Sequence, residues 1–104
     1  MVKQRTILLV SLFAHPGQEA GLREFEAAAA HIMARHGGRI ERVLHPTGAT
    51  PSTDLPTEVH LVSFPDDASF AAYRADPALA ALAPLRQASI ARTTILFADE
   101  GEGY

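Results

Sequence analysis

The 104-residue sequence predicts an α+β fold, and three observations lead to it. Segments typical of strands and helices follow one another in the order β-α-β-β-α-β, which is the ferredoxin-like split motif. Right-handed crossovers then give a four-stranded antiparallel sheet with the helices on one face. The residues are 47% hydrophobic and 20% charged, as in ordinary globular proteins. We therefore expect one domain over residues 1–104, with residues 99–104 forming a flexible tail.

The N-terminal third predicts a strand followed by an amphipathic helix. Residues 6–13 are rich in Ile, Leu, Val and Phe and form too short a run for a typical helix, which indicates a buried strand. From about Gly17 to His36 apolar residues recur at three- and four-residue steps, which predicts one core-facing helix face. Gly37 and Gly38 end this helix. The residues expected on its solvent side are Glu19, Arg23 and Glu26.

The middle of the chain predicts two strands separated by a long loop. Residues 39–45 alternate imperfectly between apolar and charged side chains, which indicates an amphipathic edge strand. Residues 46–56 carry three prolines, a glycine and several Ser and Thr, which is typical of a loop. Loops of this length are often functional. Residues 57–64 are again strongly β-forming.

The last third predicts a divided helical segment and a final strand. A helix over about residues 66–75 takes Asp66 or Asp67 as its N-cap. Asp76-Pro77 then begins a further short helix, because a capping residue followed by proline favours a helix start. Residues 90–98 predict the fourth strand.

Composition and motifs exclude several classes of function. Nine Lys and Arg against twelve Asp and Glu give a formal charge of −3, and no concentrated basic stretch offers a surface to nucleic acid. The absence of cysteine excludes disulfides, thiolate metal sites and a Cys nucleophile. Hydrolase, kinase and dinucleotide-binding motifs are also missing. Because no membrane span or cleavable leader is predicted, we expect a cytoplasmic protein with no membrane partner.

The predicted sheet has more apolar side chains than one covered face can hold. Side chains alternate along a strand, so Leu8 and Leu12 point to one face while Leu9 and Phe13 point to the other. Leaving three such side chains exposed would forfeit about 1.5–3 kcal/mol each. We therefore expect a second copy of the chain to cover the bare face in a homodimer.

The segment from Glu58 to Pro84, EVHLVSFPDDASFAAYRADPALAALAP, resembles the strand–helix segment of the small dimeric α+β barrel proteins. An apolar strand ends in Phe-Pro, and an acidic cap, a Phe-x-x-Tyr helix and an Asp-Pro restart follow it. The chain is similar to an uncharacterised branch of this superfamily, related to antibiotic biosynthesis monooxygenases and muconolactone isomerases. The resemblance implies a dimer with face-to-face sheets and a small-molecule pocket in each subunit. Some members oxidise aromatic or quinone-like substrates without a cofactor, others isomerise, and others bind or degrade haem.

Three histidines are candidates for chemistry, because histidine is the usual acid or base near neutral pH. His15 directly follows the first strand, where loops often carry function. His60 lies on the same strand face as Glu58, and antiparallel pairing around the long loop would place His45 opposite Glu58. Such a cluster could orient an imidazole as a base or bind a metal. Alternatively, His60 is a core or interface histidine bonded to Glu58.

A phenol, two arginines and a serine complete the candidate residues. Tyr73 and Phe70 share one side of the predicted helix, where they are either core residues or place the phenol in the pocket as a donor to a developing oxyanion. Arg74 and Arg92 are either solvated or hold an anionic substrate group. Ser63 either lines a cavity or bonds to the backbone.

Two functions agree with these residues. The first is a small-molecule enzyme of the cofactor-independent monooxygenase or isomerase type, acting on an apolar, oxygen-bearing ring. In this hypothesis His60 or His15 is the base and Tyr73 the donor, with no metal or cofactor. The second is a non-catalytic dimeric protein that binds a ligand or is associated with stress. The expected substrate-binding residues are Arg92, Arg74, Ser63, His45 and Glu58.

Overall fold

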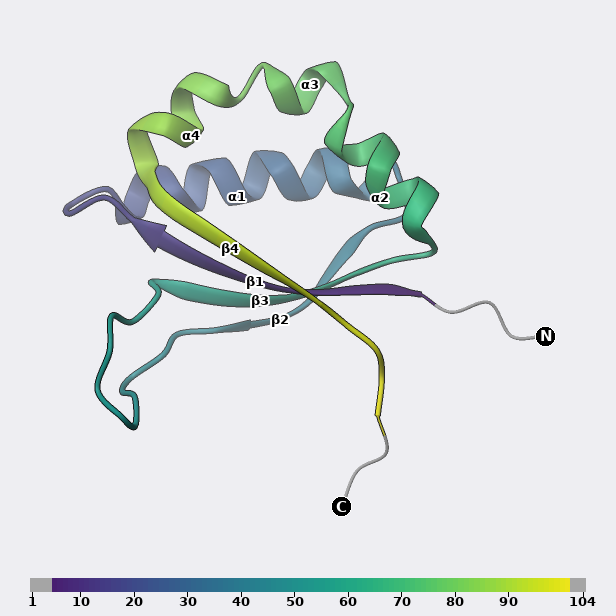
Figure 1. Ribbon diagram of the computed structural model, residues 1–104. Helices are drawn as coiled ribbons and strands as arrows, with labels where there is room; N and C mark the ends of the chain where they lie inside the picture. Colours follow the sequence, from purple (N-terminus) through teal and green to yellow (C-terminus); the bar gives the residue numbers. More distant parts are fainter. Residues whose placement is uncertain (1–4, 102–104) are drawn as a thin grey trace.

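The computed structural model describes residues 5–101, and a four-stranded antiparallel sheet forms one layer of the molecule (Figure 1). The strands lie in the order β2-β3-β1-β4, which is the predicted ferredoxin-like topology. Residues 102–104 of the predicted tail lie outside the described residues. The strands are β1 (Thr6–Ala14), β2 (Arg39–Leu44), β3 (Glu58–Phe64) and β4 (Ile90–Ala98).

The helices all lie on one face of this sheet (Figure 1). The first helical segment is a single long helix, whereas the second is divided into three short ones, one division of which Asp76-Pro77 predicts. No helix of residues 5–101 is long and apolar enough to cross a membrane. The helices are α1 (Glu19–Ala34), α2 (Asp67–Arg74), α3 (Pro77–Ala80) and α4 (Ala83–Ser89).

Short polar side chains and a glycine set the helix ends where the sequence predicts them. Asp66 accepts a hydrogen bond from the amide of Ser69 at 2.8 Å, and Asp76 accepts one from the amide of Ala78 at 2.9 Å. These bonds satisfy amides that have no partner inside the first helical turn. Gly37 follows α1 with a φ of +73°, a left-handed conformation that glycine adopts without strain.

The register of the sheet determines which side chains face the helices. In the central strand β1, Val10 pairs with His60 of β3 and with Ile95 of β4. Leu12 pairs with Glu58 in the same way. Because directly paired residues point to one face of a sheet, all five side chains point toward the helical layer.

The core under the helices consists of two apolar clusters with a polar residue between them. Val10 packs against both clusters, and its pairing partner His60 therefore lies where the two meet. The first cluster contains Leu8, Met33, Val62 and Phe64, and the second contains Leu12, Leu22 and Ile90.

The opposite face of the sheet, which we call the open face, carries apolar side chains that the helices do not cover. Leu9 pairs with Leu61 and Leu96, so these three leucines lie side by side on this face. Leu96 is 65% exposed, Leu9 is 37% exposed, and Leu44 of the edge strand is 52% exposed. The predicted second apolar face is confirmed. The homodimer expected to cover it remains a prediction.

Candidate functional site

Strand β3 presents a buried histidine and a buried glutamate to the helical layer. Glu58 and His60 are two residues apart, so alternation places both on the same face. The two residues are only 6% and 5% exposed. The Nε2 atom of His60 lies 2.9 Å from Oε1 of Glu58, and the imidazole donates this bond because a carboxylate can only accept.

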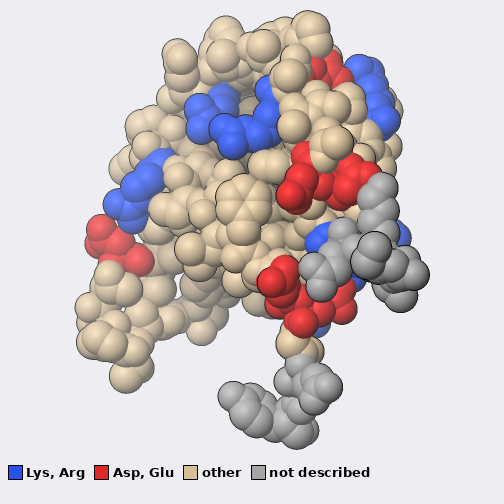
Figure 2. Space-filling model, turned by 45° about the vertical axis from the view of Figure 1, so that its right-hand side comes forward, with Lys and Arg blue, Asp and Glu red and all other residues tan. Residues whose placement is uncertain are grey.

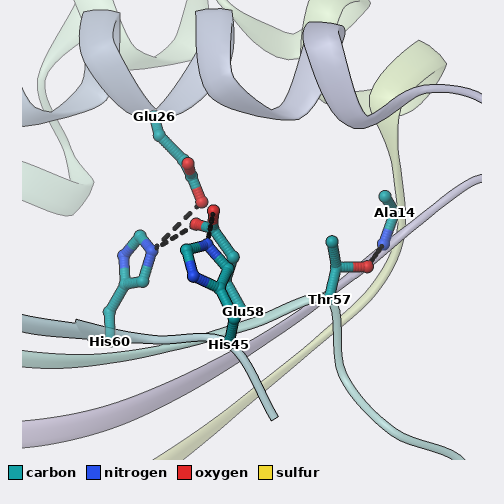
Figure 3. Close-up of polar contacts among 6 residues, drawn as sticks. All are labelled: Ala14, Glu26, His45, Thr57, Glu58 and His60. Carbon is teal, nitrogen blue, oxygen red and sulfur yellow. Dashed lines mark hydrogen bonds and ion pairs between the residues drawn. The ribbon is translucent and has the colours of Figure 1, made fainter. Parts of the chain in front are cut away.

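The loop after β2 brings a second histidine to the same carboxylate. In the β2–β3 register Leu44 pairs with Val59, so the next residue, His45, falls opposite Glu58, as predicted. Its Nε2 atom lies 2.8 Å from Oε2 of Glu58. Each carboxylate oxygen thus has its own imidazole partner (Figure 3). The His45 side chain is 69% exposed, so the cluster reaches from the core to the surface.

The fourth member of this cluster, Glu26 of α1, corrects the sequence prediction. The prediction of Glu26 on the solvent side of the helix is wrong, because its side chain is only 14% exposed. Its Oε2 atom points down at the sheet and lies 3.1 Å from Nε2 of His60 (Figure 3). The spacing of Glu26 from buried residues of the same helix could have predicted this placement. Glu26 comes four residues after Leu22 and three before Ala29, which are both buried on the core-facing stripe.

Electrostatics within the cluster pull the pKa values of the two glutamates apart. Burial raises the pKa of Glu26, and the neighbouring Glu58 adds to this rise, whereas His60 opposes it. Burial would also raise the pKa of Glu58, but the interaction with neighbouring Glu26 and the hydrogen bonds with His60 and His45 outweigh it and lower the pKa to about 2. Burial disfavours the charge on His60, yet the two carboxylates overcome this effect and raise its pKa. Two carboxyl groups with pKa values moved in opposite directions are typical of sites that transfer protons.

One oxygen of the cluster has no hydrogen bond of its own. Because Nε2 of His60 directs its bond to Glu58, Oε2 of Glu26 is buried without a hydrogen-bond partner among residues 5–101. A buried acceptor in this state favours the uptake of a proton. Glu26 is therefore the group in the cluster that is best prepared to accept a proton.

A cavity of about 430 Å³ lies between the sheet and the helices, and both Glu26 and His60 line it. Glu58 and His45 are outside this lining and hold His60 in place from the side of the sheet. A cavity of this size and character suits a small organic molecule with an apolar body. Apolar and aromatic lining residues include Val10, Phe25, Met33, Phe64, Phe70 and Ile95.

Helices α2 and α4 add polar groups to the same cavity. Tyr73 and Phe70 line it and also pack against the first apolar cluster, so they are core and cavity residues at once. Burial raises the pKa of Tyr73, which keeps it a phenol and a hydrogen-bond donor. The guanidinium of Arg74 lies 5.7 Å from the centre of the Phe70 ring. Arg86 also lines the cavity. The sequence analysis does not identify Arg86, because its position depends on how α4 lies over α1.

His15 does not join this cluster. Its Nε2 atom lies 3.1 Å from the carbonyl oxygen of Gln87, and its amide donates to the carbonyl of Ser89 at 2.9 Å. These bonds fasten the turn after β1 to the end of α4, and His15 does not line the cavity. His15 was expected as a candidate catalytic base, and this placement gives it a structural contact outside the cavity.

Ser63 and Arg92 lie on the open face, away from the cavity. The hydroxyl of Ser63 donates to Oε2 of Glu41 at 2.8 Å. Arg92 pairs with Phe13 across the β1–β4 ladder, and its guanidinium lies 4.0 Å from the centre of that ring. The sheet therefore separates both residues from His60.

Glu26, Glu58 and His60 could also hold a metal ion, since one donor atom from each lies within 4.8 Å of the others. Carboxylate and imidazole are both common ligands of divalent metals. In the structure these donors pair with one another at 2.9 and 3.1 Å.

No family model matches this sequence, and no curated protein matches it either. Solved structures do resemble it. A protein of unknown function from Rhodopseudomonas palustris has a TM-score of 0.82 at 13% identity, over 98% of this chain and 86% of that one. These values show that the two chains share a fold.

Two further structures with the same fold have names that mention oxygenase activity. A candidate antibiotic biosynthesis monooxygenase from Bacteroides thetaiotaomicron has a TM-score of 0.69 at 12% identity, over 93% of this chain and 90% of that one. SnoaB, a cofactor-independent oxygenase from Streptomyces nogalater, has a TM-score of 0.66 at 17% identity, over 94% of this chain and 96% of that one. The predicted resemblance to antibiotic biosynthesis monooxygenases is confirmed at the level of the fold, and at these identities the likeness extends to the fold alone.

Proposed function

We propose that this protein is a small-molecule enzyme of the cofactor-independent monooxygenase or isomerase type, acting on an apolar, oxygen-bearing ring. The observation that carries the proposal is the place of Glu26 and His60 in the wall of a largely apolar cavity of about 430 Å³. Proton abstraction needs a base held in position and shielded from water. The shared fold with SnoaB, a cofactor-independent oxygenase, supports the same class of reaction.

The first step of the proposed reaction removes a proton from a ring carbon that is acidified by a conjugated carbonyl. The Glu26–His60 pair accepts this proton, and the C–H electron pair remains on the substrate as an enolate. Glu58 and His45 keep the imidazole in place from behind. Tyr73 donates a hydrogen bond to the enolate oxygen, where the negative charge develops.

The enolate then has two possible outcomes, one for each reaction type. In an isomerase the same pair returns the proton to a different carbon. In a monooxygenase dioxygen is the co-reactant and accepts electrons from the enolate carbon to form a peroxide, which takes up a proton. Loss of water from the peroxide leaves a new carbonyl, so that a ring CH2 and O2 become C=O and H2O.

We also propose that the protein forms a homodimer through the open face. Leu9, Leu44 and Leu96 lie exposed there, on the side of the sheet opposite helices α1 to α4. A two-fold axis would bury the same leucines of both copies against each other. The expected cytoplasmic location, and the expected absence of nucleic-acid and membrane partners, remain predictions from the sequence.

A ligand-binding protein without turnover is the alternative, and one observation favours it. The bonds from His60 and His45 give each oxygen of Glu58 a partner, as in a structural ion network. In such a protein the cavity would need shape and polarity but no group that accepts a proton.

Turnover measurements separate the two functions. Anthrone and anthrone-2-carboxylate have a ring CH2 acidified by conjugation to the carbonyl, and their oxidation is followed by dioxygen uptake and by mass spectrometry of the quinone. The double variant His60→Gln/Tyr73→Phe is expected to fall to the rate of the reaction without protein. His15→Gln is the matched control and is expected to keep the wild-type rate, since His15 does not line the cavity.

Two results would contradict the enzyme proposal. One is an unchanged rate in the double variant with its fold and subunit number intact. The other is loss of the wild-type rate after chelation of metals, which would assign the chemistry to an ion held by Glu26, Glu58 and His60.

A further inference from the structure

We propose that the ligand of this cavity carries an oxyanion, such as a carboxylate, on its apolar body, and that Arg74 and Arg86 recognise this group. The inference rests on the proposed function and narrows its substrate class. The inferred substrate is therefore amphipathic, with the reacting carbon of its apolar ring at one end and the anionic group at the other.

The two arginines come from different helices and line the same cavity. Arg74 is the last residue of α2, and Arg86 lies in α4. Both residues are exposed, whereas Glu26 and His60 are at least half-buried at their place in the lining. The arginines therefore mark the solvent side of the cavity, and Glu26 and His60 mark its inner side.

Neither guanidinium has an acidic partner within residues 5–101. Arg5, by contrast, forms ion pairs with Glu41 and Glu100 at the end of the sheet. Figure 2 shows a group of basic side chains at the upper centre of this face, at the height of the helices in Figure 1, while other basic groups lie beside acidic ones. Two unpaired guanidinium groups beside an apolar cavity leave an excess of positive charge at its mouth.

Arg74 is held at this mouth by an aromatic ring. Its guanidinium carbon lies 5.7 Å from the centre of the Phe70 ring, within the range of a cation–π contact. Phe70 lines the cavity as well. The contact restricts the arginine before a ligand arrives, and its planar donors match the two oxygens of a carboxylate.

Glu26 and His60 at the inner side of the cavity give a reason for the ligand to bind in one orientation. At this inner side Nε2 of His60 is already bonded to Glu58, and Glu26 presents a carboxylate oxygen, so these two residues offer an anion no free donor at Nε2 or Oε2. An anionic ligand therefore places its charged group at Arg74 and Arg86 and its apolar ring against Glu26 and His60. This orientation is the one that the proposed proton abstraction needs.

The test compares two probes of nearly the same shape, 2-naphthoate and the uncharged 2-naphthamide, by isothermal titration calorimetry on the whole protein. We expect the naphthoate to bind at least about tenfold more tightly, since charge-assisted bonds from guanidinium are worth more than 1.4 kcal/mol. The double variant Arg74→Gln/Arg86→Gln should bring both probes to the same affinity and leave the amide unchanged. Arg23→Gln, on the exposed side of α1, is the matched control and should keep the tenfold difference.

A further variant locates the binding site, and the outcomes distinguish the two proposals. Ala83→Trp places a large ring in the lining of the cavity and should abolish binding of both probes. Equal affinity for the two probes, or unchanged naphthoate binding in the double arginine variant, overturns the anion site and leaves the proposed function standing. Failure of both probes to bind, or binding that Ala83→Trp does not affect, contradicts the cavity as a ligand site and overturns both proposals.

Discussion

Each face of the sheet departs in one respect from an ordinary half-buried sheet, which is apolar where it is covered and polar where it is open. The face under the helices holds the buried pair Glu58 and His60, whereas the open face exposes Leu9 and Leu96. Burial of charge is costly unless the charges are paired, and exposure of leucine forfeits the hydrophobic contribution. The buried charges are explained if the covered face holds an active site, and the exposed leucines are explained if a partner subunit covers the open face.

The largest effect is expected from breaking the cluster on the covered face. Glu58→Ala removes the acceptor shared by His45 and His60 and leaves a buried imidazole beside Glu26 alone. We expect the free energy of unfolding to fall by about 3 kcal/mol, as in other buried pairs that lose one member. Urea unfolding measures this change. Glu24→Ala, at an exposed position of α1, is the control, and an equal loss in the two variants would contradict the role of the cluster.

Acid tests the same cluster, and comparison with a Glu58→Gln variant removes the contribution of other carboxyl groups such as Glu41. The pKa of Glu58 is lowered to about 2, so its ionised form stabilises the folded state above its usual pKa of 4.5. This contribution is lost as the pH falls from about 4.5 toward 2. The wild type should therefore lose about 2–3 kcal/mol more than Glu58→Gln over this range, in urea unfolding at each pH. Parallel pH profiles for the two proteins would contradict the assignment.

A charged substitution on the open face tests the proposed dimer. Leu96→Asp places an unpaired carboxylate in the proposed dimer interface, and we expect the dimer to dissociate about a hundredfold more readily, or about 2.7 kcal/mol. The stability of the subunit itself should change by only about 0.5 kcal/mol, because Leu96 is 65% exposed. Sedimentation equilibrium measures the first quantity. A wild-type protein that sediments as a monomer at all concentrations would contradict the prediction.

The smallest effect is expected between the turn that follows α1 and the N-cap of α3, where Nε2 of His36 lies 2.8 Å from Oδ2 of Asp76. Asp76 also caps α3 by accepting from the amide of Ala78. Asp76→Ala removes the cap and the ion pair and should cost about 1 kcal/mol. Asp76→Asn keeps the cap and should cost less, as followed by thermal unfolding. Equal losses in the two variants would show that the cap contributes nothing.

Local patterns predicted most of the fold. The final strand has its predicted bounds, residues 90–98, because period-two alternation is a property of neighbouring residues. Asp66 and Asp76 cap helices as predicted, since a cap depends on amides two or three residues away. The link from His45 through Glu58 to His60 was also predictable, because one register joins the two adjacent strands that carry them.

The sequence by itself thus determined the order of the elements, the caps, the two apolar faces of the sheet and the histidine–glutamate core of the site. Only the tertiary structure decided that the helices cover the face of His60 and leave Arg92 and Ser63 on the other side. It also turned Glu26 toward the sheet and brought Arg86 to the cavity. The physical reason is that strand alternation and capping act over a few residues. The rotation of a helix about its axis is settled only when its whole surface packs against a distant part of the chain.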